Sequence, residues 1–369
     1  MIIVGAGSHG LSLAYHLVKK GFDKDIKIVE MRRIGFGSSS RNASRFRYHF
    51  NSRENINYAK KAIPYLLSHA NELKLNPLLY FTGYLWVLRD EKQISMLKKL
   101  HNRWSSEGIG GKFVECEEFG FIKYDGLCYY APQDGAFHHD YILYSYYIEV
   151  KGKAEIIIDE AKRIVFKGER VKGVELAHGG VLEDNEVVVT AGAWTGKLLE
   201  NSGIKLPIYP EKKEIFITED ISFRVKPLVI DTLNKVYFSQ TLKGEIIGGT
   251  ETPIPYGFLP FTNSLAELSH FLRAVRETIK GAEGIGILRG WSGYYEMTPD
   301  SSHIMGYDEE WPEGLYVNAG YSGHGMMFAP YSGKIMAELI LDGVMREEMR
   351  PYLPNRFRTN KLIEENLVI

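Results

Sequence analysis

The first thirty residues combine short apolar runs with one amphipathic stretch. Residues 2–4 (Ile-Ile-Val) predict a buried strand, and residues 26–30 (Ile-Lys-Ile-Val-Glu) predict a second one. Between them, apolar residues recur at helical spacing over residues 11–20, and Gly21 follows as a helix stop. This pattern predicts a strand–helix–strand unit at the start of the chain.

The rest of the chain mixes helical patterns with many short strand patterns. We expect a Gly/Ser/Arg loop over residues 34–51, helices over 53–75, 90–107 and 264–280, and strands over 81–88, 153–192 (a meander), 208–250 and 315–320. A last helix is expected from about Pro330 to Leu341, with Gly343 behind it, and the tail from Met349 is expected to be peripheral. The mixture indicates an α/β or α+β fold.

Composition and charge exclude several classes of protein. The chain has 369 residues and a net charge of −1, so no global field favours nucleic acid or an anionic membrane. No uncharged apolar run is long enough to span a bilayer. Because the N-terminus enters a strand at once, no signal peptide is expected, and a cytoplasmic location follows as an expectation.

The chain contains two cysteines, Cys116 and Cys128, without a CxxC pair. Neither a metal site nor a disulfide framework is expected from so few cysteines, and a reducing interior is the better match. No metal is therefore expected in the site.

A Gly-x-Gly-x-x-Gly pattern links the first strand and helix, with Gly5, Gly7 and Gly10 at its fixed positions. Such glycines allow a tight turn, a close approach of the backbone to a diphosphate, and close helix–strand packing. Glu30 ends the second strand, where an acidic side chain can accept hydrogen bonds from a ribose. The pattern predicts a dinucleotide site; a bare turn is the alternative, and the cradle alone leaves FAD and NAD undecided.

Three segments together resemble the D-amino acid oxidase superfamily of FAD enzymes. They are the cradle with Glu30, the run 187–194 (VVVTAGAW), and Thr298-Pro299-Asp300 followed by 314–316 (GLY) and 320–325 (GYSGHG). The nearest likeness is to sarcosine oxidase β subunits, the β subunits of archaeal L-proline dehydrogenases, and glycine oxidase. The resemblance implies FAD as the cofactor.

The resemblance also implies a split architecture. A Rossmann-like FAD-binding domain would be built from residues 1–75, 146–204 and 291–369. A discontinuous second domain on an antiparallel β-sheet, built from residues 76–145 and 205–290, would bind the substrate.

The resemblance assigns site residues. Arg47, Tyr295 and His324 would be catalytic. The structural alternatives are, in the same order, a solvated loop arginine, a core tyrosine and a packed loop histidine. The residues implied to bind the cofactor are Gly5, Ala6, Gly7, Ser8, His9, Gly10, Glu30, Met31, Arg32, Arg41, Asn42, Arg47, Ala191, Gly192, Trp194, Gly293, Gly323, His324, Gly325, Met326 and Met327.

The chain departs from the family pattern in ways that bear on the reaction. Gly293 stands where monomeric sarcosine oxidase links FAD through a cysteine, and Met327 replaces a lysine that holds the substrate carboxylate. Ile246 loosely aligns with the lysine that activates oxygen, which favours a dehydrogenase over an oxidase. His139 resembles the histidine that holds a second flavin, FMN, at a subunit interface.

The function implied is oxidation of the C–N bond of an amino acid or secondary amine such as proline, sarcosine or glycine, by hydride transfer to flavin N5, giving an imine. Partner subunits or a homo-oligomer are compatible with this. The alternatives are a non-catalytic FAD-holding subunit of a larger complex and an NAD-dependent dehydrogenase. A flavin enzyme acting on a nucleic-acid base is disfavoured, because the chain has no basic tract.

Overall fold

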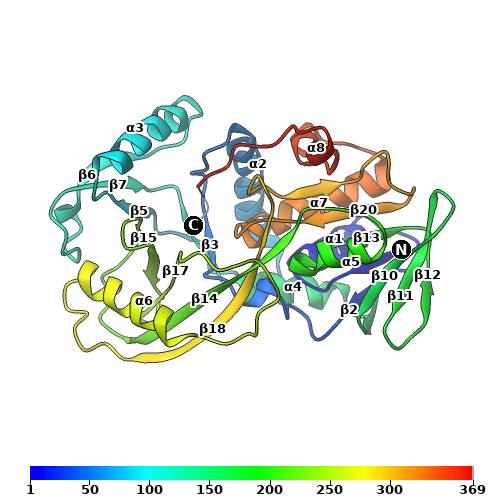
Figure 1. The fold of residues 1–369 in the computed structure, drawn as a ribbon, viewed down its shortest axis with the longest axis horizontal. Helices are drawn as coiled ribbons and strands as arrows, with labels where there is room; N and C mark the ends of the chain where they lie inside the picture. Colours follow the sequence, from blue (N-terminus) through cyan, green and yellow to red (C-terminus); the bar gives the residue numbers. More distant parts are fainter. Residues whose placement is uncertain (368–369) are drawn as a thin grey trace.

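A six-stranded sheet forms one half of the molecule in the computed structural model, which describes residues 1–367 (Figure 1). The strand order is β19-β20-β13-β1-β2-β9, and all neighbours are parallel except β19 and β20. The strands are β1 (Ile2–Val4), β2 (Lys27–Glu30), β9 (Glu155–Ile158), β13 (Val187–Val189), β19 (Ile304–Gly306) and β20 (Leu315–Ala319).

The two faces of this sheet are covered by different layers. Alternate residues such as Ile3, Ile28 and Val188 face a core shared with four helices, α1 (Ser8–Lys19), α2 (Arg53–His69), α4 (His139–Val150) and α7 (Gly325–Asp342). On the other face, Ile2, Val4 and Val29 pack against a three-stranded antiparallel sheet and a short helix. These are β10 (Ala161–Lys167), β11 (Arg170–Leu176), β12 (Val181–Glu183) and α5 (Thr195–Asn201).

The second half of the molecule is built on an eight-stranded sheet of order β18-β14-β17-β16-β15-β5-β7-β6. It is antiparallel except for the pair β15 and β5. The strands are β5 (Tyr84–Val87), β6 (Lys112–Glu115), β7 (Leu127–Ala131), β14 (Tyr209–Asp220), β15 (Leu228–Asp231), β16 (Val236–Gln240), β17 (Glu245–Thr250) and β18 (Ile287–Met297). One mainly parallel and one mainly antiparallel sheet with flanking helices confirm the expected α/β (α+β) class.

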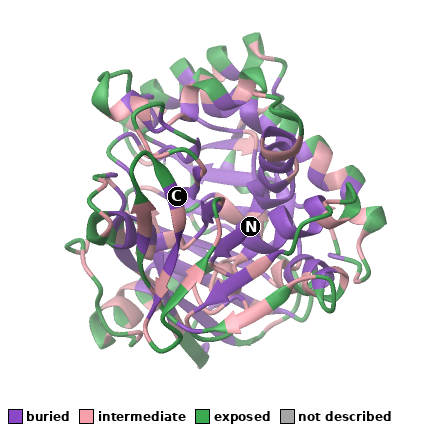
Figure 2. Cartoon of the chain, turned by 90° about the vertical axis from the view of Figure 1, so that its right-hand side faces the viewer, coloured by how far each residue is buried: buried purple, intermediate pink, exposed green. Residues whose placement is uncertain are grey.

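The remaining elements connect or cover these sheets. A small sheet orders β3 (Arg45–Phe46), β8 (Gly135–Ala136) and β4 (Tyr80–Phe81). The other helices are α3 (Glu91–Ser106), α6 (Leu265–Thr278) and α8 (Asn355–Arg358), with 3-10 turns at Ser38–Ser40, Ala70–Glu72, Cys116–Glu118, Gly192–Trp194 and Glu347–Tyr352. Buried residues concentrate on the strands and inner helix faces (Figure 2).

Two expected boundaries differ from the structure. Within residues 153–192, only β10, β11 and β12 form the expected meander. Strand β9 instead pairs in parallel with β2. The last helix begins at Gly325 rather than near Pro330, which lies inside it. A proline at this depth forgoes the hydrogen bond to the carbonyl of Met326, a residue that lines the cavity described below. Gly343 ends the helix in the left-handed conformation, as expected.

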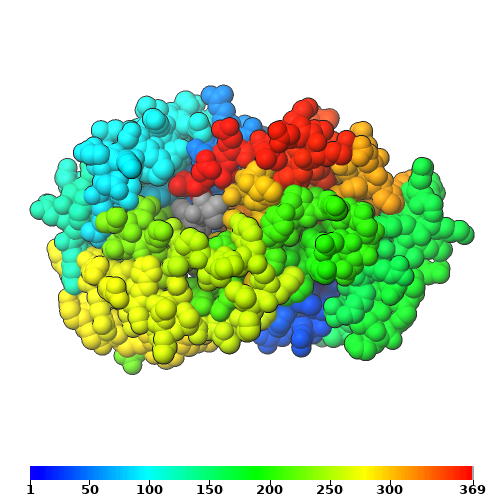
Figure 3. Space-filling view, in the orientation of Figure 1, coloured from blue at the N-terminus to red at the C-terminus, as the bar shows by residue number. Residues whose placement is uncertain are grey.

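The tail from Met349 is not peripheral, which corrects the expectation. Met349 and Tyr352 are buried in the main core, and Arg356 is buried against Asp300. The guanidinium of Arg356 donates to both carboxylate oxygens of Asp300, at 2.8 and 3.1 Å. After α8 the chain runs back towards α2, as the red segment in Figures 1 and 3 shows, and buries Glu365 there.

The absence of a disulfide was also wrongly expected. Cys116 and Cys128 form a disulfide with their Cα atoms 5.1 Å apart. Strands β6 and β7 are antiparallel neighbours, and Cys116 follows β6 while Cys128 lies on β7. The hairpin therefore brings together two cysteines whose spacing in sequence carries no disulfide signal.

Candidate functional site

One elongated cavity lies at the carboxyl ends of the parallel strands, where β1 separates β2 from β13. This is the position at which open parallel sheets bind ligands. The lining comes from both ends and the middle of the chain, with residues around Gly5, Glu30, Arg41, Thr190, Tyr295 and His324. The site is thus assembled from segments that are far apart in sequence.

The glycines of the first loop are required by close contacts. Gly5 has φ +111°, and a Cβ there would lie 2.5 Å from the carbonyl oxygen of Thr190. A Cβ on Gly10 would lie 2.0 Å from the carbonyl oxygen of Gly5, so helix and strand pack closely there. Gly7 is less crowded, since the nearest atom is the hydroxyl of Ser39 at 3.0 Å, and it lines the cavity.

The amino-terminal end of α1 faces the cavity without a side-chain cap. Its N-cap residue is Gly7, and residues 7–9 line the cavity. The backbone N–H of Ser8 donates to the hydroxyl of Ser39 at 2.9 Å. The partial positive charge of a helix N-terminus and its unpaired N–H groups favour an anion such as a diphosphate.

Glu30 lies at one end of the cavity, after β2. Its carboxylate accepts hydrogen bonds from the backbone N–H groups of Ala6 at 2.9 Å and Arg32 at 3.0 Å. Burial raises the pKa of Glu30, and these backbone bonds oppose the shift. Carboxylate lone pairs that remain unused can accept from ribose hydroxyls.

Most of the residues assigned to the cofactor line this one cavity, and three do not. The ones along it are Gly5, Gly7, Ser8, His9, Glu30, Met31, Arg41, Asn42, Arg47, Ala191, Gly192, Trp194, Gly293, Gly323, His324, Gly325, Met326 and Met327. Ala6 is buried behind the loop and acts through its N–H, Gly10 acts through packing, and Arg32 points its guanidinium over the ring of Phe36. The cavity is also lined by residues that the sequence analysis did not assign: Ser39, Asp159, Lys197, Lys213 and Tyr237. Two of them stood at positions that could have indicated a site, because Ser39 lies in the serine-rich loop and Asp159 directly follows a strand.

Arg41 fixes the loop that crosses the middle of the cavity. Its guanidinium donates to the carbonyl oxygens of Phe36 at 2.9 Å and Ser292 at 3.0 Å. It also lies 4.3 Å from the ring centre of Phe261. Asn42 donates to the carbonyl oxygen of Ser39 at 2.8 Å. Both side chains thus order the loop that lines the cavity.

A second uncapped helix N-terminus faces the same cavity. Helix α7 starts after His324, which makes no side-chain cap, and residues 323–327 line the cavity. Gly323 has φ +95°, and a Cβ there would lie 2.6 Å from the ring of Tyr295. The loop before it is held by Glu296, whose carboxylate accepts from the N–H of Gly320 at 2.9 Å. Burial raises the pKa of Glu296 to about 7.

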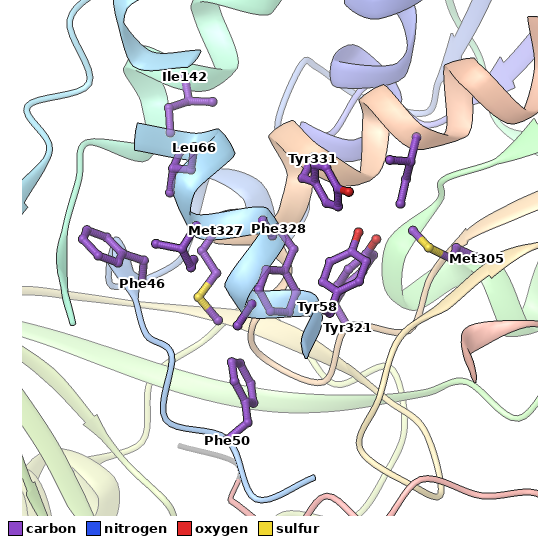
Figure 4. Close-up of a cluster of buried hydrophobic side chains, with 14 of the residues drawn as sticks. Phe46, Phe50, Tyr58, Leu66, Ile142, Met305, Tyr321, Met327, Phe328 and Tyr331 are labelled. Carbon is purple, nitrogen blue, oxygen red and sulfur yellow. The ribbon is translucent and has the colours of Figure 1, made fainter. Parts of the chain in front are cut away.

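The ring of His324 packs against Phe50 and Phe328, whose ring centres each lie 5.3 Å from its own. Figure 4 shows those two phenylalanines beside Tyr321 and Met327 in the buried cluster. Burial, with smaller contributions from Arg47 and His9, holds the pKa of His324 well below its usual value. The imidazole is therefore neutral, and its Nε2 is a buried polar atom without a partner in residues 1–367.

Arg47 is buried at the same end of the cavity, with a relative exposure of 5%. It is not a solvated loop residue. Its guanidinium donates to the carbonyl oxygens of Leu367 at 2.6 Å and His49 at 3.3 Å, and lies 4.4 Å from the ring centre of Phe50. No acidic side chain pairs with it within the described residues. Three of its five N–H donors remain for a ligand.

The β14–β18 end of the large sheet supplies the wall opposite Arg47. Tyr295 lines the cavity beside Tyr237, and burial raises the pKa of Tyr295 to about 12. Lys213 also lines it, with its ammonium 2.8 Å from a carboxylate oxygen of Glu211. Glu251 lies near these groups, and burial raises its pKa to about 7 against the opposing charges of Lys213 and Arg47. Sequence patterns did not single out Lys213 or Glu251.

The donors along the cavity suit three parts of FAD. Glu30 marks an end suited to a ribose, the α1 terminus suits a diphosphate, and the α7 terminus suits the pyrimidine edge of a flavin ring, where negative charge grows on reduction. The orphaned Nε2 of His324 lies at that last position. Gly293 lies beside Arg41. A Cβ added to Gly293 would lie only 3.1 Å from the Cβ of Arg41, so glycine avoids a close contact there.

No group of three or more His, Cys, Asp or Glu side chains in residues 1–367 is arranged to hold a metal ion. Across the same residues, every helix is too short or too polar to cross a bilayer.

Comparisons with known proteins agree with this geometry. The family model "DAO: FAD dependent oxidoreductase" matches residues 1–339. Sarcosine oxidase subunit beta of Rhodobacter capsulatus is 26% identical over 383 aligned positions, covering 100% of this chain and 90% of that protein. Among solved structures, L-proline dehydrogenase from P. horikoshii has a TM-score of 0.89 at 28% identity, covering 98% of both chains.

Glycine oxidase from Geobacillus kaustophilus shares the fold, with a TM-score of 0.88 at 20% identity over 96% of this chain and 98% of that one. The family match covers most of the chain, including both helix termini that face the cavity. The chain therefore belongs to the DAO family of FAD-dependent oxidoreductases.

Proposed function

We propose that this protein is an FAD-dependent dehydrogenase that oxidises the C–N bond of a small amino acid or secondary amine. The observation that carries the proposal is Arg47, a buried guanidinium without an acidic partner in residues 1–367, at the end of the cavity where His324 and the α7 terminus meet. A buried cation of this kind suits a substrate carboxylate. The named activities of the relatives support a substrate that is an amino acid or amine.

The chain's residues would bind and orient the substrate. Arg47 holds the carboxylate, and the aromatic walls from Tyr84, Tyr237 and Tyr295 exclude water. Exclusion of water disfavours the charged ammonium, so the amine binds in its neutral form. The residues along the cavity would hold FAD, which would supply the acceptor for the hydride that leaves the carbon next to nitrogen. The nitrogen lone pair then forms the C=N bond, and the N–H proton passes to bulk solvent once the product leaves the site.

The preference for a dehydrogenase is part of the proposal. Ile246 is buried in the apolar cluster of the large sheet, away from the cavity lining, so no cation stands at that position. Lys213 brings an ammonium to the cavity, but Glu211 pairs with it. We expect slow reoxidation by oxygen and fast reoxidation by a dye acceptor. Fast reaction with oxygen that is lost in Lys213→Met would identify an oxidase instead.

We also propose His139 as the residue that holds a second flavin, FMN. His139 has its Nδ1 against the hydroxyl of Ser44 and its Nε2 3.4 Å from Asp140. Its side chain is 16% exposed, so an FMN attached there would have to lie at the surface beside a partner subunit. Relatives named as β subunits support such a partner. FMN measured in protein purified with its natural partners would test this.

Anaerobic titration of the FAD-loaded protein with a panel of amino acids and N-alkyl amino acids tests the main proposal. We expect one class to bleach the flavin band, and Arg47→Ala to raise the Michaelis constant for it sharply. Arg53→Ala, an exposed arginine of α2, is the matched control. Unchanged kinetics in Arg47→Ala would exclude its carboxylate role, and a flavin that no amine bleaches would indicate a non-catalytic subunit.

A further inference from the structure

Arg45 lies two residues before Arg47 and lines the same end of the cavity. It belongs to β3, where successive side chains point to opposite sides. Phe46, between the two arginines, is fully buried and packs against Phe81. Arg45 and Arg47 thus leave the backbone on the same side, with Cα atoms about 7 Å apart.

The guanidinium of Arg45 reaches across to the large sheet. Its Nη2 donates to the hydroxyl of Ser239 on β16, the strand that also carries Tyr237. Its Nε is buried and has no hydrogen-bond partner in residues 1–367. Nor does any acidic side chain of that stretch form an ion pair with it.

Arg356 is the other buried arginine of residues 1–367, and it is paired with an acid, as is the half-buried Arg89. Arg89 donates to Asp231 at 2.7 Å, and Arg356 donates to Asp300 at 2.8 Å. Two guanidinium groups that line one cavity without acidic partners are costly, because removal from water penalises each charge. An anionic ligand that contacts both would offset this cost.

We infer that the substrate carries two carboxylates, one bound by Arg47 and the second by Arg45, as in an acidic amino acid or an N-carboxyalkyl amino acid. This inference rests on the proposed function for the carboxylate at Arg47 and extends it to a substrate class. Arg45 is then a specificity-determining residue. Lys213, already paired with Glu211, adds to the positive potential but is not assigned to either carboxylate.

Binding of carboxylates that lack an amine separates this inference from catalysis. The FAD-loaded protein is titrated with glutarate and with butyrate, and binding is followed by the change in the flavin spectrum and by calorimetry. We expect glutarate to bind at least about tenfold more tightly than butyrate. Arg45→Met should remove that preference while leaving butyrate within about twofold, and Arg47→Met should weaken both.

Controls keep the result interpretable. Arg53→Met should bind both acids as the unchanged protein does, and flavin content reports folding of each variant. Should Arg45→Met fail to fold, Arg45→Lys, which keeps the charge, should retain a preference for glutarate. The inference would be overturned if the unchanged protein bound glutarate and butyrate with equal affinity. It would also be overturned if Arg45→Met lowered the affinity for both acids by the same factor.

The two failures are distinguishable. If amino acids bleach the flavin but glutarate has no advantage, the proposed function stands and the second carboxylate site does not. If glutarate binds through Arg45 but no amine bleaches the flavin, the anion site stands and the proposed reaction does not.

Discussion

Gly333 of α7 lies directly against Ser12 of α1. A Cβ on Gly333 would come within 2.2 Å of the Ser12 hydroxyl oxygen and 2.6 Å of the Ser12 carbonyl carbon. One turn before Ser12 on α1, the Nδ1 of His9 lies 2.9 Å from the hydroxyl of Ser332 on α7. These contacts hold the two helices side by side, so that both N-termini face one cavity.

Gly333→Ala should therefore destabilise the protein by about 1–3 kcal/mol, because the added methyl group meets backbone as well as a hydroxyl. Displacing α7 should also weaken FAD binding. Chemical denaturation and the dissociation constant for FAD measure the two effects. Gly110→Ala is the matched control, since its Cβ would meet nothing closer than 3.7 Å. Wild-type FAD affinity in Gly333→Ala would show that this contact does not position the site.

The sequence was informative where the chemistry demands local spacing. Gly5, Gly7 and Gly10 follow a strand and open a helix, and the structure places Gly5 and Gly7 at the cavity and Gly10 where helix and strand pack, as a cradle of that kind requires. His324 could be related to them only through the family resemblance. The long separation in sequence between residues 10 and 324 does not predict that helices α1 and α7 pack side by side.

The substrate end was much less predictable. Arg45 and Lys213 line one cavity, and Glu251 lies near Lys213, because tertiary pairing sets the neighbours of β3, β14 and β17. The disulfide was missed for the same reason, because the hairpin of β6 and β7 was not assigned. The tail was misjudged because its buried residues, such as Met349, Tyr352 and Arg356, alternate with more exposed ones and follow no regular apolar period.

The Arg356–Asp300 pair should make the tail part of the fold. Both side chains are buried, and Asp300 also accepts from the N–H of Ile363 at 3.1 Å. Arg356→Met leaves a buried carboxylate without its cation and should cost about 3–5 kcal/mol. Arg350→Met, an exposed arginine in the same segment, should change stability by less than about 0.5 kcal/mol. Equal denaturation midpoints for the two variants would contradict a structural role for the tail.

The disulfide should be detectable in the purified protein. Alkylation and mass measurement should find Cys116 and Cys128 linked. Replacing both by alanine should lower the free energy of unfolding by about 2–3 kcal/mol, because closing this short loop restricts the unfolded chain. A reducing agent should have a similar effect on the unchanged protein and none on the double variant. Two freely alkylated thiols in protein prepared without reductant would contradict the pairing.

The carboxyl of Glu296 should make stability depend on pH. Burial raises its pKa from 4.5 to about 7 in the folded protein. Between these pH values the Glu296 carboxyl is ionised in the unfolded chain and protonated in the folded protein, so raising the pH lowers the free energy of unfolding. Above about pH 7 the carboxyl is ionised in both states, and the lost stability no longer changes with pH. Glu296→Gln keeps an oxygen for the N–H of Gly320 and removes this titration.

Glu296→Gln should thus match the unchanged protein near pH 4.5 and exceed its stability by about 2 kcal/mol at pH 8. Denaturation midpoints across that range, with exposed Glu309→Gln as control, measure the difference. A difference that does not vary with pH would mean that the carboxylate is already ionised in the fold. The loop from Gly320 would then be held by a charged acceptor, and the variant would be less stable at every pH because a charge-assisted hydrogen bond is lost.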